Sequence, residues 1–358
     1  MATLKELSTG KTNSITLLRL IAALAVIYGH SYAIVLSGGR DWVTKVTGYA
    51  HAGGLAVDFF FLLSGFLVSA SITKRGLISY SVSRALRLLP ALWVYLILMV
   101  FLIAPILTKL TIKEYFSTTQ TWNYLFSLGT GTSTEWFLPG VFESNRNTSA
   151  NGSIWSVILE IRMYLYLALF YMFGMFRSRL IFNFAFGVLV LTVWSGTMEM
   201  PGISGVNDIH MSLLFALGCF LYVNKDLVEA SPLFILTAFA LAGATHGSDK
   251  FQYGYILLLT CLFCATAFLR NGSWMDRFGD YSYGVYLWGW PVQQFFATIF
   301  PETPAHTNAL ISMVFALLLA IASWHLIEKQ ALKLKNRSDQ FAKQIRVNIS
   351  ELIAKKVR

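Results

Sequence analysis

Residues 14–36 read SITLLRLIAALAVIYGHSYAIVL, an apolar run long enough to cross a membrane as one helix. Within it, Arg19 and His30 are eleven positions apart, which on an α-helix places them within about 20° of one face and roughly 16 Å apart along the axis. Ionisable side chains inside such segments are costly, usually face the interior of the bundle and mark functional positions. The run therefore predicts a cation and a titratable base at two depths of one helix.

The composition is that of a membrane protein with several spans. Hydrophobic residues make up 56% of the 358 residues and charged residues only 13%, and the mean hydropathy is +0.58. An average soluble domain is far less apolar. We therefore expect an all-α, polytopic integral membrane bundle of about ten transmembrane helices. The predicted spans are residues 15–35, 54–72, 88–107, 154–175, 180–198, 209–223, 232–246, 252–269, 281–300 and 307–327.

The basic residues indicate how these helices are oriented. The formal net charge is +10, but Lys and Arg are not gathered on a soluble domain, so the positive-inside rule explains the excess better than nucleic-acid binding does. With both termini in the cytoplasm, most of the 28 Lys and Arg residues fall in inner segments. Those in outer segments are Arg40, Lys45, Lys109, Lys113, Arg146 and Lys250. We expect N- and C-termini in the cytoplasm and no nucleic-acid partner.

Two stretches lie outside the predicted spans. The outer segment from Thr108 to Ser153 is the longest, and its middle, EWFLPGVF at residues 135–142, is apolar enough to dip into the membrane interface or to fold back over the bundle as a substrate lid would. Residues 329–358 are basic with apolar side chains at near-helical spacing, as in a helix lying on an anionic leaflet. The chain thus divides into a membrane domain, residues 1–328, and a basic amphipathic cytoplasmic tail, residues 329–358.

The cysteines give no sign of a disulfide framework or a metal site. Cys219, Cys261 and Cys264 all fall in predicted spans, and the C-x-x-C pair lacks histidine partners, so packing explains it better than metal binding. We expect no metal and no ATP site, since neither a histidine cluster nor a Walker lysine motif is present.

The ionisable residues of the predicted helices fall at two levels. Three arginines converge on the cytoplasmic mouth: Arg19, Arg84 and Arg87. Three titratable groups share an outer level: His30, Asp58 and Glu160. Clustered guanidinium groups bind phosphate oxygens, and histidine can act as a general base near neutral pH. A phosphate-rich donor held inside and a proton abstracted further out would suit acyl transfer from a thioester such as acetyl-CoA, whose extended pantetheine arm can connect the two levels.

Each of these residues alone has a simpler structural explanation. Arg19 could snorkel to the inner interface, and Arg84 and Arg87 could be topogenic charges. A lone membrane histidine often serves as an interhelical hydrogen-bond partner, and a buried carboxylate can belong to a structural ion pair. The combination, rather than any single residue, favours a functional site.

Five sequence motifs occur in order along the chain. They are Arg19 with His30 as R-x10-H, GGLAVDFFFLLSGFLVS at 53–69, RALRLLP at 84–90, NGSIWSVILEIRMYLYL at 151–167, and GDYSYGVYLWGWPVQQ at 279–294 followed by SWHLIEKQALKL at 323–334. Over residues 13–330 this pattern resembles the acyltransferase family 3 membrane proteins, bacterial inner-membrane enzymes that O-acylate carbohydrates. The chain departs from that pattern at Gly289 and Gln330, where many members carry histidine and proline, so these two residues are left out of the predicted site.

The resemblance implies a role for each predicted site residue. His30 would act as a base toward an acceptor hydroxyl or carry the acyl group transiently, and Glu160 or Asp58 would orient the histidine or place the sugar. The residues implied to hold the coenzyme A phosphates are Arg19, Arg84 and Arg87. Those implied to contact the carbohydrate are Trp155, Tyr164, Ser64 and Tyr283.

The resemblance also implies the reactants and the setting. Acetyl-CoA would be the acyl donor, and the acceptor would be a cell-surface polysaccharide or its lipid-linked precursor. We expect the bacterial inner membrane as the location, with membrane lipids and polysaccharide-assembly proteins as further partners.

Two other kinds of function fit some of the same residues. In a proton-coupled secondary transporter or an exporter of a polysaccharide precursor, intramembrane histidine and carboxylates relay protons. Such proteins often contain inverted repeats with paired broken helices, and the sequence shows none. In a scaffold for polysaccharide assembly, the charged residues would only hold helices together.

Overall fold

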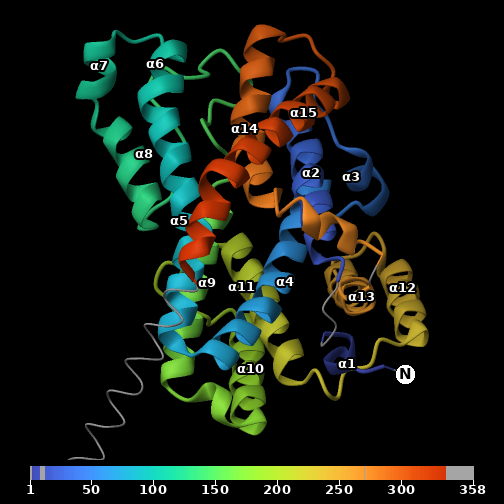
Figure 1. The fold of residues 1–358 in the computed structure, drawn as a ribbon. Helices are drawn as coiled ribbons and strands as arrows, with labels where there is room; N and C mark the ends of the chain where they lie inside the picture. The colour runs from blue at the N-terminus through green and yellow to red at the C-terminus, as the bar shows by residue number, and fades with distance from the viewer. Residues whose placement is uncertain (1, 9–12, 270, 336–358) are drawn as a thin grey trace, which may run out of the picture.

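The computed structural model describes residues 2–8, 13–269 and 271–335, and this part of the chain is helical without a β-sheet (Figure 1). The elements are α1 (Leu4–Ser8), α2 (Ile15–Ile34), α3 (Trp42–Thr47), α4 (Ala52–Arg75), α5 (Leu77–Leu98), the π-helical η1 (Met99–Ile103), α6 (Ala104–Leu107), α7 (Ile112–Ser117), α8 (Thr119–Thr130), α9 (Trp155–Met172), η2 (Met175–Arg177), α10 (Arg179–Trp194), α11 (Val206–Val223), α12 (Pro232–Thr245), α13 (Phe251–Thr266), η3 (Ser273–Arg277), α14 (Ser282–Ile299), α15 (Ala305–Ser323) and the π-helical η4 (Trp324–Glu328).

The expected multi-pass membrane character is supported by the lengths of these helices. Among the described residues, six helical segments are both long and apolar enough to cross a membrane: Ile15–Ile34, Ala52–Arg75, Leu77–Leu107, Trp155–Met172, Val206–Val223 and Ala305–Lys335. The other four predicted spans also fall on helices, of which α10, α12 and α13 are apolar but shorter. The all-α fold is confirmed, whereas the count of ten spans and the cytoplasmic position of both termini stay predictions.

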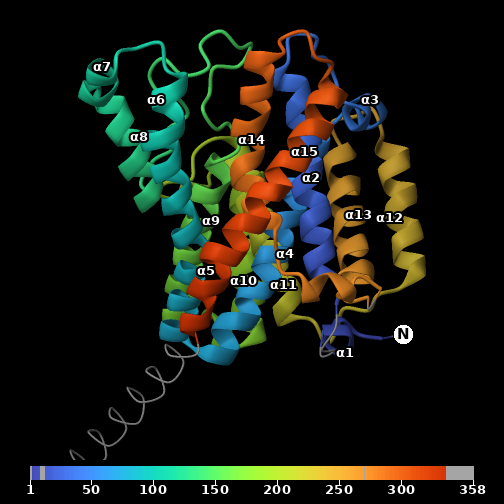
Figure 2. The ribbon, with the colours of Figure 1, turned by 45° about the horizontal axis from the view of Figure 1, so that its top comes forward.

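The helices that carry the predicted site pack against one another in the middle of the molecule. α2 contacts α4, α14 and α15, and α14 also contacts α15 (Figure 2). The bundle has two ends, which we name by the residues of α2 that lie there. Arg19 lies near the start of α2, at the arginine end, and His30 lies in its last turns, at the histidine end, beside α3.

Small residues let α4 and α11 approach closely. A Cβ atom at Gly65 would collide with the Phe215 carbonyl oxygen, and one at Gly218 would collide with that of Leu62. Close backbone approach at small residues is a common way for membrane helices to associate, because lipid gives no hydrophobic drive for it. The crossing brings the polar residues of α4 next to α9 and α11.

The segment between Thr108 and Ser153 folds against the bundle, as the apolar middle of this segment suggested. Its last part is tied to α14, since the Trp290 Nε1–H donates to the Ser149 carbonyl at 3.0 Å and the Asn151 amide donates to the Leu287 carbonyl at 3.1 Å. Its role as a lid stays a prediction. Most of the predicted tail lies outside the described residues, which end at Lys335.

Candidate functional site

Two of the predicted arginines share one carboxylate at the arginine end. Arg87 Nη2 lies 2.5 Å from Asp280 Oδ2, and Arg19 Nε lies 3.1 Å from the same oxygen. Arg87 Nη1 also lies 3.4 Å from Glu328, whose carboxylate is 1% exposed and accepts the Ser323 hydroxyl. The π-helical turn η4 ends on Glu328, so it sets the position of this carboxylate. The cluster joins α2, α5 and η4 to the connection that precedes α14.

Asp280 itself is held in the ionised form. Burial favours the neutral carboxyl, but the charges of Arg19 and Arg87 and the hydrogen bonds from Ser282 outweigh it and hold the pKa of Asp280 at about 2. This pKa lies below the value of about 3.9 for an Asp in the unfolded chain. The ionised Asp280 therefore stabilises the folded state fully above about pH 3.9, and this contribution is lost as the pH falls toward about 2.

Arg84 differs from the other two arginines. Among the described residues it forms no ion pair; its Nη2 donates to the Ser83 hydroxyl at 3.3 Å, and its guanidinium lies 5.8 Å from the centre of the Tyr164 ring. Its Nε is buried without a hydrogen-bond partner. A buried donor without a partner costs free energy, and an anionic ligand would remove that cost.

A second cluster lies deeper in the bundle, on α4 and α9. Glu160 Oε1 accepts hydrogen bonds from the Ser64 hydroxyl at 2.6 Å and the Tyr164 hydroxyl at 2.5 Å. Both bonds end on Oε1, and no bond to Oε2 is formed within the described part of the chain. The structure therefore brings three predicted site residues together, with one carboxylate oxygen available to a ligand.

A small cavity connects Glu160 with the arginine end. Its lining includes Arg19, Glu160, Ser282, Tyr283 and Tyr286, and its volume of about 40 Å³ leaves room for a few water molecules. His30 does not line this cavity. Tyr286 lines it, and its hydroxyl is hydrogen-bonded to Ser156 and to the Ser153 carbonyl.

His30 has two aromatic neighbours at the histidine end. The centre of its ring lies 4.8 Å from that of Trp290 and 5.5 Å from that of His51. His30 is half-buried, and its nitrogens form no hydrogen bond to any described residue. Gly29 and Gly53 allow this arrangement, because a Cβ at Gly29 would lie 2.6 Å from the Gly53 nitrogen and 2.7 Å from His51 Nδ1. The imidazole is thus fixed by ring contacts while its nitrogens stay available.

Asp58 lies on another side of α4. It is 3% exposed, and its Oδ1 is 3.0 Å from Nε2 of His210 on α11. Within the described residues neither Asp58 nor Glu160 makes a hydrogen bond or ion pair with His30. The expected contact between a carboxylate and the histidine is therefore not formed in this conformation.

The remaining predicted residues are divided between two places. Tyr283 lines the Glu160 cavity, and its hydroxyl donates to the Leu88 carbonyl at 3.0 Å. Trp155 instead lines a polar pocket on the opposite face of α9, together with Trp136, Arg162 and Asp208.

Sequence reasoning gave no role to three residues of these clusters: His51, His210 and Asp280. Asp280 stands in the GDYSYG run, and an acidic residue at the same end as three arginines was a usable signal. His51 just precedes the 53–69 motif, but only the Gly29–Gly53 contact places it beside His30. The described residues contain no group of three or more His, Cys, Asp or Glu side chains that could hold a metal ion.

Comparison with known proteins gives consistent matches. A family described as acyltransferase domain matches residues 12–325. The "O-acetyl transferase" of Shigella phage Sf6 is 29% identical over 338 residues, covering 90% of this chain and 96% of the relative. The "Putative peptidoglycan O-acetyltransferase YrhL" of Bacillus subtilis (strain 168) is 26% identical over 333 residues, covering 78% of this chain and 51% of the relative. No solved structure is significantly similar to the chain.

The substitution Asp280→Asn tests the arginine-end cluster. It removes the charge that Arg19 and Arg87 share while keeping the shape, so we expect the free energy of unfolding to fall by about 3 kcal/mol. The measurement is unfolding of the purified protein in mixed detergent micelles.

Asp226→Asn is the matched control, since Asp226 pairs with Arg179 at 2.6 Å but both side chains are about 40% exposed. Its effect should be much smaller, because solvent screens an exposed ion pair. Equal effects of the two substitutions would contradict a structural role for the buried cluster.

Proposed function

The chain belongs to the acyltransferase domain family, and on this premise we propose that it moves an acetyl group from acetyl-CoA to a hydroxyl of a carbohydrate. It is a multi-pass membrane enzyme of the O-acetyltransferase kind, as its family, its relatives and its apolar helices indicate. The observation that carries the finer proposal is the arrangement on α2, where Arg19 lies near one end and the His30 ring, without a hydrogen bond to a described residue, lies near the other. Arg84 on α5 adds a guanidinium whose Nε has no hydrogen-bond partner.

The donor would bind at the arginine end. Coenzyme A carries several phosphate groups, and guanidinium groups bind phosphate oxygens through charge-assisted hydrogen bonds. Arg19 and Arg87 are already paired with Asp280, so Arg84 would make the primary contact and the other two would add attraction as the shared carboxylate adjusts. We place this end in the cytoplasm, where acyl-CoA is made, and the chain in the bacterial inner membrane.

The reaction needs a base for the acceptor hydroxyl. In the direct route, His30 takes the hydroxyl proton while the oxygen attacks the thioester carbonyl; the C–O bond forms, the C–S bond breaks, and the proton passes to the leaving thiolate. In the alternative route, a His30 nitrogen first takes the acetyl group and the thiolate leaves with the ring proton, after which the hydroxyl attacks the acyl-imidazole and returns its proton to the ring. Both routes yield one ester and one free thiol.

The Glu160 cluster lies between the two levels and would guide the reactants. Oε2 of Glu160 faces no protein donor, so it can accept a hydrogen bond from a pantetheine amide or a sugar hydroxyl. Tyr286 lies one turn before Trp290 on α14, so rotation of its side chain away from Ser156 would connect the cavity with the His30 level. Asp58, paired with His210, would hold α11 against α4 near the histidine end.

The acceptor would be a surface polysaccharide or its lipid-linked precursor, bound at the histidine end. The named activities of the relatives, an O-acetyl transferase and a peptidoglycan O-acetyltransferase, support a carbohydrate hydroxyl as the group that is modified. Polysaccharide-assembly proteins would deliver that acceptor outside the membrane.

His30→Ala tests the role of the base. Loss of a positioned general base typically costs 10²–10⁴-fold in rate, and loss of an acyl carrier costs at least as much, so acetylation of the glycan should fall by about that factor. Glycans of a deletion strain complemented with each variant are compared by mass spectrometry for the acetyl increment, with membrane insertion checked by immunoblot.

His306→Ala serves as the control, because His306 is exposed at the start of α15. It should restore acetylation as well as the parent does. Full acetylation in cells that carry His30→Ala would contradict the proposed chemistry.

Arg84→Ala tests donor binding at the arginine end. The variant removes the unpaired guanidinium, so the KM for acetyl-CoA should rise about tenfold, the effect of losing one charge-assisted contact of about 1.4 kcal/mol. The KM for the acceptor should stay within about twofold.

Arg179→Ala is the matched control for Arg84→Ala, since Arg179 begins α10 at the same end of the bundle but is exposed and paired with Asp226. An unchanged KM for acetyl-CoA in Arg84→Ala would overturn the assignment of the donor site.

A further inference from the structure

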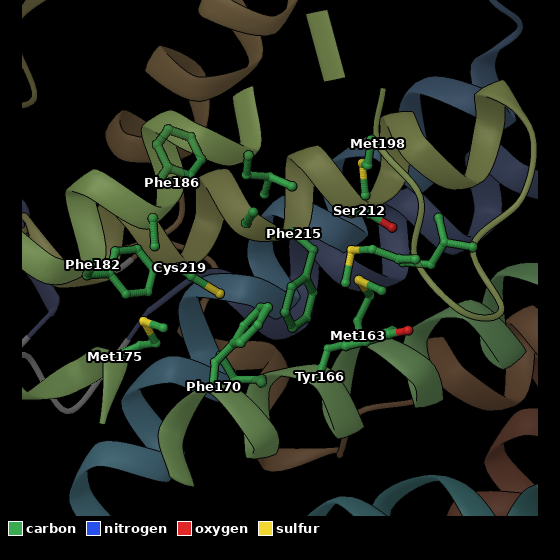
Figure 3. Close-up of a pocket in the computed structure, with 16 residues that line it drawn as sticks. Met163, Tyr166, Phe170, Met175, Phe182, Phe186, Met198, Ser212, Phe215 and Cys219 are labelled. Atoms are coloured by element: carbon green, nitrogen blue, oxygen red, sulfur yellow. The ribbon is translucent and has the colours of Figure 1, made fainter. Parts of the chain in front are cut away.

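An apolar cleft lies between α9, α10 and α11, apart from the Glu160 cavity (Figure 3). Its lining follows i, i+3, i+4 and i+7 spacing on each helix, from Met163 to Phe170, from Phe182 to Leu189 and from Ser212 to Cys219. Such a run of eight residues extends about 10 Å along a helix, so the three lined faces enclose an elongated space. At about 130 Å³ the cleft is roomier than the 40 Å³ cavity at Glu160.

The cleft offers a polar ligand no charged group and no free hydroxyl hydrogen. No charged side chain lines it, and its two hydroxyl groups are already used: Tyr166 donates to the Pro201 carbonyl at 2.6 Å and Ser212 to the Asp208 carbonyl at 2.7 Å. Aromatic rings, thioethers, aliphatic side chains and the Cys219 thiol make up the rest, with Phe170, Phe182 and Phe215 pointing into the space in Figure 3. A space of this kind stays dry or takes an apolar molecule.

The helix that covers the cleft is only lightly packed. No residue of α10 is fully buried, and Phe184 and Leu191, on the face away from the cleft, are 73% and 59% exposed. In a membrane that outer face meets lipid chains.

A polar pocket lies at the end of the cleft nearer the histidine end. Arg162 of this pocket precedes Met163 of the cleft in the chain, and Ser204 of the pocket follows Ile203 of the cleft. The pocket offers two tryptophan rings, Trp136 and Trp155, with amide, carboxylate and hydroxyl groups. Aromatic faces with several hydrogen-bonding groups suit a sugar, and the Arg162 guanidinium adds attraction for a phosphate.

The pocket and the cleft are both connected to the site already described. Trp155 comes three residues after Gly152, which packs on the Trp290 ring that contacts His30. Phe215 of the cleft packs on Tyr164, which binds Glu160, with ring centres 6.3 Å apart. A molecule with an apolar chain and a sugar headgroup would thus lie along α9, with its sugar toward the histidine end.

We propose that the α9–α10–α11 cleft binds the hydrocarbon chain of a lipid-linked carbohydrate and that the Trp136–Trp155 pocket binds the sugar next to it. This rests on the proposed function, and it selects the lipid-linked form of the acceptor over the free polymer. The enzyme would then take its acceptor from within the membrane.

The experiment measures binding of a polyprenyl-phosphate-linked monosaccharide to the full chain in nanodiscs by native mass spectrometry, without any acyl donor. Ala185→Trp fills the cleft from α10, and Leu191→Trp adds similar bulk on the outer face of the same helix. We expect Ala185→Trp to weaken binding of this probe at least tenfold and Leu191→Trp to leave it within twofold. The methyl glycoside of the same sugar should bind weakly and equally to all three proteins.

A second measurement uses the unmodified protein, so that a folding defect in Ala185→Trp does not decide the outcome. A diazirine on the polyprenyl chain should label residues that line the cleft, such as Leu167 on α9, Ala185 on α10 or Ala216 on α11. Labels confined to the outer faces of the helices, or equal binding of the lipid-linked sugar and the methyl glycoside, would overturn the proposal. Binding in the cleft is measured independently of acetyl transfer. A protein that binds the probe but does not acetylate it in a separate assay with acetyl-CoA would refute the proposed function and leave the lipid site standing.

Discussion

The buried charges at the arginine end constrain the whole bundle. Guanidinium and carboxylate groups taken out of water must pair with each other, and here one carboxylate, Asp280, serves both Arg19 and Arg87, with Glu328 adding a second contact. The pairs join helices that are far apart in sequence and fix α2 at its start. Because α2 is continuous from Ile15 to Ile34, fixing its start also sets the position of His30 near its end. Arg84 makes no ion pair among the described residues, so its guanidinium is available to the proposed anionic donor.

The rest of the site depends on where the helices approach closely and where they leave space. Gly29 and Gly53 bring α2 and α4 together and place His51 beside His30, while Gly65 and Gly218 bring α4 against α11. A small cavity is lined by both Arg19 and Glu160, and a larger apolar cleft is lined by Phe215. The cavity has charged side chains in its lining and the cleft has none, and the two proposed reactants differ in the same way. A charged thioester would enter from the arginine end, and an acceptor carried on a hydrocarbon chain would approach along α9.

The sequence predicted the helices well and their partners poorly. Runs of apolar residues identify a membrane helix without reference to its neighbours, so the predicted span 15–35 differs from Ile15–Ile34 by one residue. The structure brings the motif residues Ser64, Glu160 and Tyr164 into one cluster, whereas helical spacing had grouped Glu160 with His30 and Asp58. Helical spacing gives the face on which a residue lies but not which helix faces it, so the His210 partner of Asp58 was not foreseen. For the same reason, sequence spacing does not distinguish the residues that line the apolar cleft from residues of a packed core.

The central claim is that donor and acceptor bind at opposite ends of the bundle, and the side of the membrane on which each is supplied tests it most directly. The protein is reconstituted in sealed vesicles with labelled acetyl-CoA either trapped inside or added outside, and the carbohydrate acceptor is present outside only. With acetyl-CoA inside the vesicles, we predict labelled ester on the acceptor, made by the protein molecules whose arginine end faces the lumen. With donor and acceptor both outside, we predict no labelled ester. Transfer with both reactants on the same side would contradict the account.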